Sequence, residues 1–134
     1  MKTVMVLAAS LIAGAAHAGA LDECYQKTSN RSEVGSCLEA ARTAAFAQER
    51  LAARALEANL AELQAISSAK GLVMALRSAE RHFEPYMKAQ CELVRATYAS
   101  GTGAAQAGLA CEVDLLRARA TELKPMTPAA PAAN

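Results

Sequence analysis

Cysteine and histidine are the side chains with the clearest chemical potential in this 134-residue chain, which has four cysteines and two histidines. Clustered cysteines and histidines bind zinc, and two cysteines in C-x-x-C spacing form a redox pair. No two cysteines here have that spacing, and His17 lies in a segment that we expect to be removed. The sequence therefore favours two structural disulfides over a zinc or redox site.

The remaining titratable side chains predict no catalytic centre. A general acid–base pair needs two such groups in one pocket. The carboxylates are scattered, and we expect them on solvated helix faces as partners of arginines and lysines four residues away. A lone His82 is more typical of a surface or packing residue than of a base or ligand. With no nucleophile or phosphate-binding motif either, the sequence predicts a protein that is not an enzyme and has no cofactor or metal.

The first 18 residues have the pattern of a secretory signal peptide. Lys2 precedes an apolar run over residues 4–13, and Ala16-His17-Ala18 provides small residues for cleavage. The apolar run is shorter than the ~20 residues that span a bilayer, which argues against a membrane anchor. Cys24 lacks the small apolar residues that a lipid-attachment cysteine needs before it. We therefore expect cleavage after Ala18, a periplasmic or secreted protein, and no membrane span after cleavage.

Charge and composition restrict the partners of the mature chain. Loss of Lys2 with the signal peptide leaves 13 basic and 13 acidic residues in residues 19–134. A nucleic-acid or anionic-membrane partner would require a basic excess, so neither is predicted. Residues 19–124 suit one domain, and the uncharged, proline-containing residues 125–134 indicate a disordered or polyproline-like tail.

Apolar residues at steps of three and four predict helices over about 36–66, 69–99 and 103–124, with a shorter one near 21–28. Ser36 with Glu39 has capping-box spacing, and Ser67 or Ser68 could cap the next helix. Pro85 predicts a kink near residues 81–85. The last helix has two apolar faces and so needs two neighbours. The expected fold is all-α, a small bundle of three long helices plus a short N-terminal helix, stapled by two disulfides.

The helical periodicity also predicts which side chains form the core. We expect the face of the first long helix that carries Arg50, Arg54 and Glu57 to lie in solvent, opposite the face that packs into the core. The expected core residues are Leu38, Ala45, Phe46, Ala52, Ala53, Leu56, Leu60 and Leu63 in the first long helix, Leu72, Val73, Leu76, Phe83, Met87, Cys91, Val94 and Tyr98 in the second, and Leu109, Val113, Leu116, Ala120 and Leu123 in the third.

Helix geometry selects one of the three possible cysteine pairings. Folding the last two helices about residues 100–103 puts Cys91 and Cys111 at the same height, each about ten residues from the bend. Folding the first two about residues 67–68 separates Cys37 from Cys91 by roughly 12 Å, beyond the ~7 Å Cα limit of a disulfide. We therefore predict the disulfides Cys24–Cys37 and Cys91–Cys111.

The C-terminal half combines an aromatic residue, two tyrosines, a glycine turn, two cysteines, an arginine and a leucine in a characteristic order. These residues are Phe83, Tyr86, Cys91, Tyr98, Gly101, Cys111, Arg119 and Leu123. The order resembles the LprI-type lysozyme inhibitor family, and Cys24 with Cys37 ahead of a long helix resembles its N-terminal part. Phe83 replaces the family's usual tryptophan, Met87 its usual arginine, and Pro85 is unexpected.

The resemblance implies an exported, disulfide-bonded helical domain that binds a protein partner, with lysozyme as the candidate because a named member inhibits it. We assign partner contacts to Tyr86, Tyr98, Glu112 and Asp114, although packing against the core is the more usual role for the two tyrosines. The alternative is a structural or adaptor protein of the cell envelope without lysozyme inhibition, which the neutral charge and proline-containing tail would also suit. The oligomeric state is left open.

Overall fold

A computed structural model describes residues 19–99, 101, 103–124 and 126 of the chain. It contains the helices α1 (Ala20–Lys27), α2 (Arg31–Ile66), α3 (Leu72–Thr97) and α4 (Ala104–Leu123), and no strand among the described residues. The predicted all-α fold is confirmed. The predicted signal peptide, and the predicted tail except Met126, lie outside the described residues.

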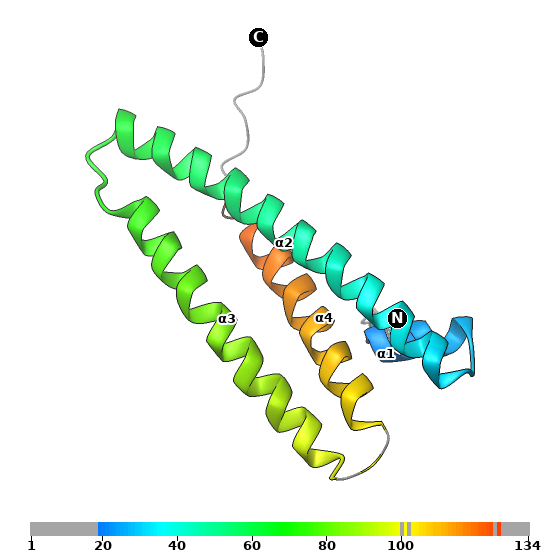
Figure 1. The fold of residues 1–134 in the computed structure, drawn as a ribbon. Helices are drawn as coiled ribbons and strands as arrows, with labels where there is room; N and C mark the ends of the chain where they lie inside the picture. Colours follow the sequence, from blue (N-terminus) through cyan, green and yellow to red (C-terminus); the bar gives the residue numbers. More distant parts are fainter. Residues whose placement is uncertain (1–18, 100, 102, 125, 127–134) are drawn as a thin grey trace, which may run out of the picture.

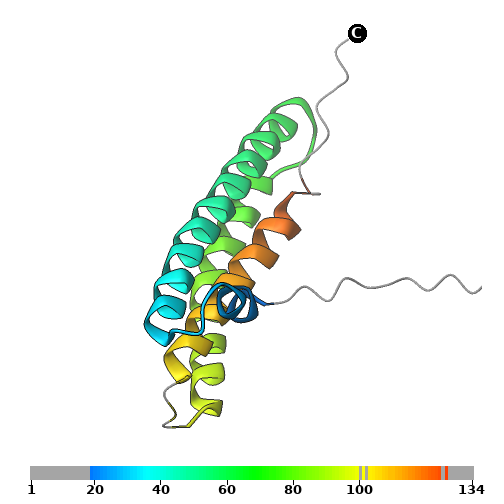
Figure 2. The same ribbon diagram turned by 90° about the vertical axis from the view of Figure 1, so that its right-hand side faces the viewer.

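Helix α4 occupies the centre of the bundle. Figure 1 shows α2 and α3 as the two arms of a long hairpin, with α4 between them. Helix α4 contacts α2 most extensively and α3 next, whereas α2 and α3 contact each other much less. Figure 2 shows α1 nearly end-on, crossing the long helices where it packs against α2 and α4. The last helix was predicted to need two neighbours for its two apolar faces. These neighbours are α2 and α3.

The start of α2 corrects the predicted capping box. The helix begins at Arg31, five residues before Ser36, because the side chain of Asn30 accepts a hydrogen bond from the Ser32 amide at 2.9 Å. Ser36 lies inside the helix, where its hydroxyl donates to the Ser32 carbonyl. The added turn lets Val34 join Leu38 in the core, both with no exposed surface.

The start of α3 corrects the second predicted cap. Ser67 ends α2 instead of starting α3, because its hydroxyl donates to the Leu63 carbonyl at 2.6 Å. Gly71 then turns the chain with a φ of 73°, and Gln64 accepts a hydrogen bond from the Leu72 amide at 2.9 Å. A positive φ favours glycine, so the turn residue and not the serines decides where α3 begins. Helix α3 is one continuous element through Pro85, and the predicted kink stays a prediction.

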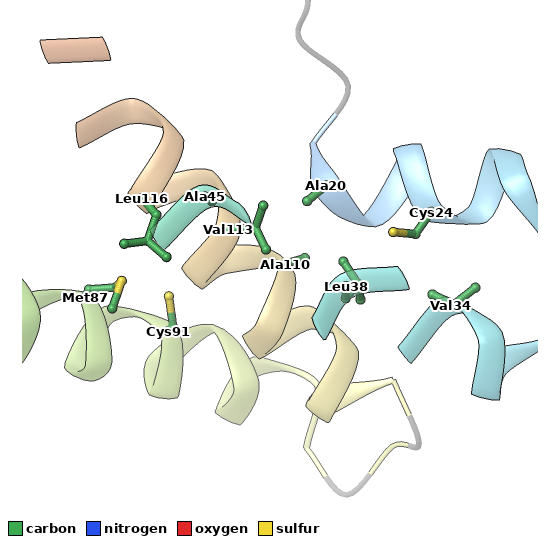
Figure 3. Packing of buried hydrophobic residues seen from close by; sticks show 10 residues of the cluster. All are labelled: Ala20, Cys24, Val34, Leu38, Ala45, Met87, Cys91, Ala110, Val113 and Leu116. Atoms are coloured by element: carbon green, nitrogen blue, oxygen red, sulfur yellow. The ribbon is translucent and has the colours of Figure 1, made fainter. Parts of the chain in front are cut away.

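Two apolar clusters fill the bundle. The larger draws on all four helices, and Figure 3 shows side chains of α4 such as Val113 and Leu116 between those of α2 and α3. The smaller cluster contains Ala53 and Leu56 of α2, Leu76 of α3 and Leu123 of α4. Every one of these four is less than 9% exposed. Most of the predicted core is therefore in place.

Three predicted core residues are exposed. Phe46 is 46% exposed because its neighbour Ala45 occupies the position that faces α4. Leu63 is 38% exposed because α4 ends at Leu123, which packs beside Leu56 two turns earlier on α2. Tyr98 is 47% exposed because α3 ends at Thr97.

Both predicted disulfides are present. Cys24–Cys37 joins α1 to α2 with a Cα–Cα distance of 5.8 Å, and Cys91–Cys111 joins α3 to α4 with a distance of 5.4 Å. No cysteine is free. In the chain-entropy model such short loops contribute about 3 kcal/mol each, which matters for a core rich in alanine.

The central position of α4 predicts a large effect of Leu116→Ala. Leu116 is 1% exposed inside the larger cluster, so its truncation should lower the free energy of unfolding by about 2–5 kcal/mol. Leu93→Ala is the matched control, because Leu93 is 60% exposed and should change stability by no more than about 0.5 kcal/mol. Urea unfolding of both oxidised variants measures the difference, and equal losses would contradict the assigned core.

Candidate partner-binding site around Arg119

A layer of charged side chains separates the two apolar clusters. Each long helix contributes one residue to it, namely Glu49 of α2, Glu80 of α3 and Arg119 of α4. Each lies four residues from a member of the smaller cluster: Glu49 precedes Ala53, Glu80 follows Leu76, and Arg119 precedes Leu123. Helical periodicity therefore turns all three inward.

Glu49 and Glu80 form a hydrogen-bonded carboxyl pair. Glu49 is 3% exposed, and burial together with its hydrogen bond to Glu80 raises the pKa of Glu49 from 4.5 to about 7. Burial also acts to raise the pKa of Glu80, but hydrogen bonds from Glu49 and Arg119 outweigh it and hold that pKa below its usual value. We infer that the protonated Glu49 donates to the ionised Glu80 below neutral pH.

Arg119 connects this pair to α4. Its Nη2 lies 2.6 Å and its Nε 3.1 Å from Oε1 of Glu80, and both side chains are less than a fifth exposed. The guanidinium also lies over the Phe83 ring, 5.6 Å from its centroid, and contacts Glu122 at 3.4 Å. The charge of Arg119 is thus neutralised by carboxylates and covered by an aromatic face.

The prediction that the carboxylates lie on solvated helix faces was wrong for Glu49. Glu49 stands four residues after Ala45 and four before Ala53, so it continues the buried stripe of α2. That spacing was the available signal. The sequence pattern did not reveal that Glu49 is buried, because a carboxylate is rarely buried unless another part of the fold supplies a partner. Glu49 itself is only 3% exposed, and its Oε1 has no hydrogen-bond partner among the described residues.

A groove of about 390 Å³ runs between α3 and α4 beside Arg119. Its lining residues are Ala79, His82, Phe83, Tyr86, Leu115, Ala118, Arg119 and Glu122. Tyr86 is 55% exposed and so offers an aromatic surface and a hydroxyl to a partner. The groove thus brings together Phe83, Tyr86 and Arg119, three residues on which the family resemblance rests.

The four predicted contact residues do not form one patch on a single helix face. Tyr98 lies twelve residues after Tyr86 and therefore about 18 Å further along the axis of α3. Its ring lies next to Gly103 in the turn before α4. Glu112 forms an ion pair with Arg42 of α2, and its side chain is 15% exposed. Asp114 accepts a hydrogen bond from the Ala20 amide at 2.9 Å. Both carboxylates thus contact other helices of the bundle, and their predicted partner contacts stay a prediction.

Metal ligation and membrane insertion receive no support from the part of the chain that the structure describes. No three histidine, cysteine or acidic side chains there lie close enough together to hold a metal ion. None of the described helices combines the length and the apolar character needed to cross a bilayer.

The chain matches a protein-family model over most of its length. The family model described as lysozyme inhibitor LprI matches residues 21–123, which include all four cysteines and the residues of the charged layer. Searches of curated proteins and of solved structures find no match.

Glu49→Gln should remove a pH dependence of stability. The pKa of Glu49 is raised in the folded state, so the stability it contributes is complete below pH 4.5 and is lost as pH rises through about 7. Between pH 5 and pH 8 the unmodified protein should lose roughly 1–3 kcal/mol from this group. The glutamine stays neutral, so Glu49→Gln should lack this loss in urea unfolding. Exposed Glu62→Gln should retain it, and identical slopes for both variants would contradict the assignment.

Arg119→Met should destabilise the protein strongly. Removing the guanidinium leaves the largely buried Glu80, whose side chain is 17% exposed, without its cation, and breaking a buried ion pair in this way typically costs about 3–5 kcal/mol. Arg117→Met, two residues away, is the matched control because the Arg117–Glu23 pair is more exposed and should contribute at most about 1 kcal/mol. Thermal and urea unfolding compare the two. Adding Glu80→Gln to Arg119→Met should restore part of the loss, and no restoration would argue against an unpaired charge as its cause.

Proposed function

Because the chain belongs to the LprI lysozyme inhibitor family, we propose that it is an exported, non-enzymatic protein that binds a protein partner, with lysozyme as the first candidate. The family match over residues 21–123 supports this proposal. The two disulfides support export, since disulfides persist in oxidising compartments such as the periplasm and the extracellular space. The predicted cleavage after Ala18 would leave Gly19 as the first residue of the mature protein.

The groove beside Arg119 is the contact surface that we propose. Tyrosine is enriched among the residues that dominate binding energy, and exposed Tyr86 is flanked there by Phe83 and Arg119. The Cys91–Cys111 disulfide joins α3 and α4 between the groove and the turn that connects the two helices. A surface that is rigid before binding loses less entropy when a partner docks, which favours tight inhibition.

Long-range electrostatic attraction gives little help in an encounter with an enzyme whose cleft is lined by acidic groups. Inhibition requires occlusion of that cleft, and the mature chain has no net charge to repel or attract the enzyme at long range. Affinity must then come mainly from the close contact of aromatic and polar side chains. The proposal therefore rests on shape and local chemistry more than on electrostatic steering.

Titration of the oxidised protein into c-type and g-type lysozymes tests this function, with cell-wall turnover and calorimetry measured together. We expect saturable inhibition near one-to-one stoichiometry. Tyr86→Ala should weaken it at least tenfold because it removes the exposed ring, whereas Tyr86→Phe keeps the ring and should stay within about threefold. Tyr98→Ala tests the other predicted tyrosine in the same assay.

Two outcomes would contradict the proposal. Absence of binding at tens of micromolar, with a folded and oxidised sample, would exclude these lysozymes and favour an envelope adaptor that pulldown should detect. Inhibition unaffected by Tyr86→Ala would retain the function but remove the groove as its contact surface.

A further inference from the structure

A second groove, of about 510 Å³, lies between α2 and α3, and arginines make up half of its lining residues. Its walls contain Arg50 and Arg54 from α2 and Arg77 and Arg81 from α3, and the remaining lining residues are Ala53, Glu57, Leu76 and Glu80. We call it the arginine groove. It is distinct from the groove beside Arg119, which lies between α3 and α4 and contains Tyr86. We call that one the Tyr86 groove. The hairpin arms that form it are the green and cyan helices of Figure 1.

The acidic side chains of the arginine groove already have partners. Glu57 accepts hydrogen bonds from Nε and Nη2 of Arg77, at 3.0 and 2.5 Å. Glu80 is engaged by Arg119 from α4. Arg50 lies over the Phe46 ring, 5.3 Å from its centroid. The carboxylates are thus used within the bundle.

Arg54 and Arg81 remain without an ion-pair or hydrogen-bond partner among the described residues, and both are exposed. Four arginines against two glutamates give the groove an excess of two positive charges, although the mature chain as a whole is neutral. The positive charge is therefore a local feature of this groove.

Helix geometry places the two unpaired arginines level with each other. The Arg77–Glu57 contact shows that these two positions face each other across the hairpin. Arg54 lies three residues from Glu57 and Arg81 four from Arg77, both away from the loop, so each is about one turn further down its helix. Their heights then differ by only about 1.5 Å. Two guanidinium groups flank the same level of one groove.

We propose that the arginine groove binds an acidic peptide segment, with Arg54 and Arg81 each binding one of its carboxylates. Guanidinium groups match carboxylates with two parallel hydrogen bonds, and the neighbouring Arg77 and Arg119 already bind carboxylates of this chain. The floor of the groove includes Ala53 and Leu76, so it can also contact the apolar part of a peptide. Its volume is in the range of ordinary ligand sites.

A peptide fits better than a nucleic acid or a membrane surface. Those partners bind through extended basic faces, whereas the excess charge here is confined to one groove of a neutral chain. Exposed arginine–carboxylate pairs are individually weak and are screened by salt, so binding should be modest and should weaken as ionic strength rises.

Fluorescence anisotropy with a fluorescein-labelled hexaglutamate peptide tests the proposal on the oxidised protein. We expect saturable binding at low salt that Arg54→Gln with Arg81→Gln weakens at least tenfold. Lys27→Gln with Lys70→Gln removes the same charge from exposed positions outside the groove and should leave binding within about twofold. Glu57→Gln should strengthen binding severalfold, because it releases Arg77 for the peptide. Circular dichroism verifies that each variant is folded.

Three results would overturn the proposal: no saturable hexaglutamate binding, equal loss in the arginine and lysine double variants, or arginine-dependent binding of pyrophosphate or anionic vesicles without binding of hexaglutamate. The last would reassign the groove to phosphate groups. Lysozyme inhibition should be unchanged by Arg54→Gln with Arg81→Gln, because the Tyr86 groove lacks both residues. Failure of the peptide site and failure of the proposed lysozyme contact can thus be told apart.

Discussion

The buried contact between Arg119, Glu80 and Glu49 constrains the whole bundle. It joins α4, α3 and α2 at one level between two apolar clusters, and a shift of any long helix by one turn would separate a buried charge from its partner. Hydrophobic packing alone tolerates such shifts more easily, because alanine and leucine recur along these helices. Desolvating the charges costs free energy, so the layer contributes more to the choice of register than to net stability.

This register determines which surfaces are left for binding. Because α4 ends at Leu123, it fills only part of the space between the longer α2 and α3. The Tyr86 groove opens where α3 meets α4, and the arginine groove opens where α2 faces α3. Arg119 lines the first, and its partner Glu80 lines the second. One aromatic and one cationic surface thus share the same support, the contact between Arg119 and Glu80.

Local sequence signals predicted the elements better than their ends. Cysteine spacing yielded both disulfides, since two antiparallel helices bring residues equally distant from a turn to the same height. Helix starts were wrong where several residues could cap: Asn30 competes with Ser36, and Gly71 competes with the serines at 67 and 68. Contacts within the fold decided where both helices begin. The earlier start of α2 brings Val34 into the core, and the side chain of Gln64 accepts a hydrogen bond from the Leu72 amide at the start of α3.

The sequence by itself determined the all-helical class, the disulfide pairing and the family, since each depends on spacing along one chain. Only the tertiary structure decided the charged layer and both grooves. Glu49 and Glu80 are 31 positions apart and Arg119 is a further 39, so no local pattern relates them. Their burial follows from the meeting of three helices, where each charge is tolerated only because the other helices supply its partner.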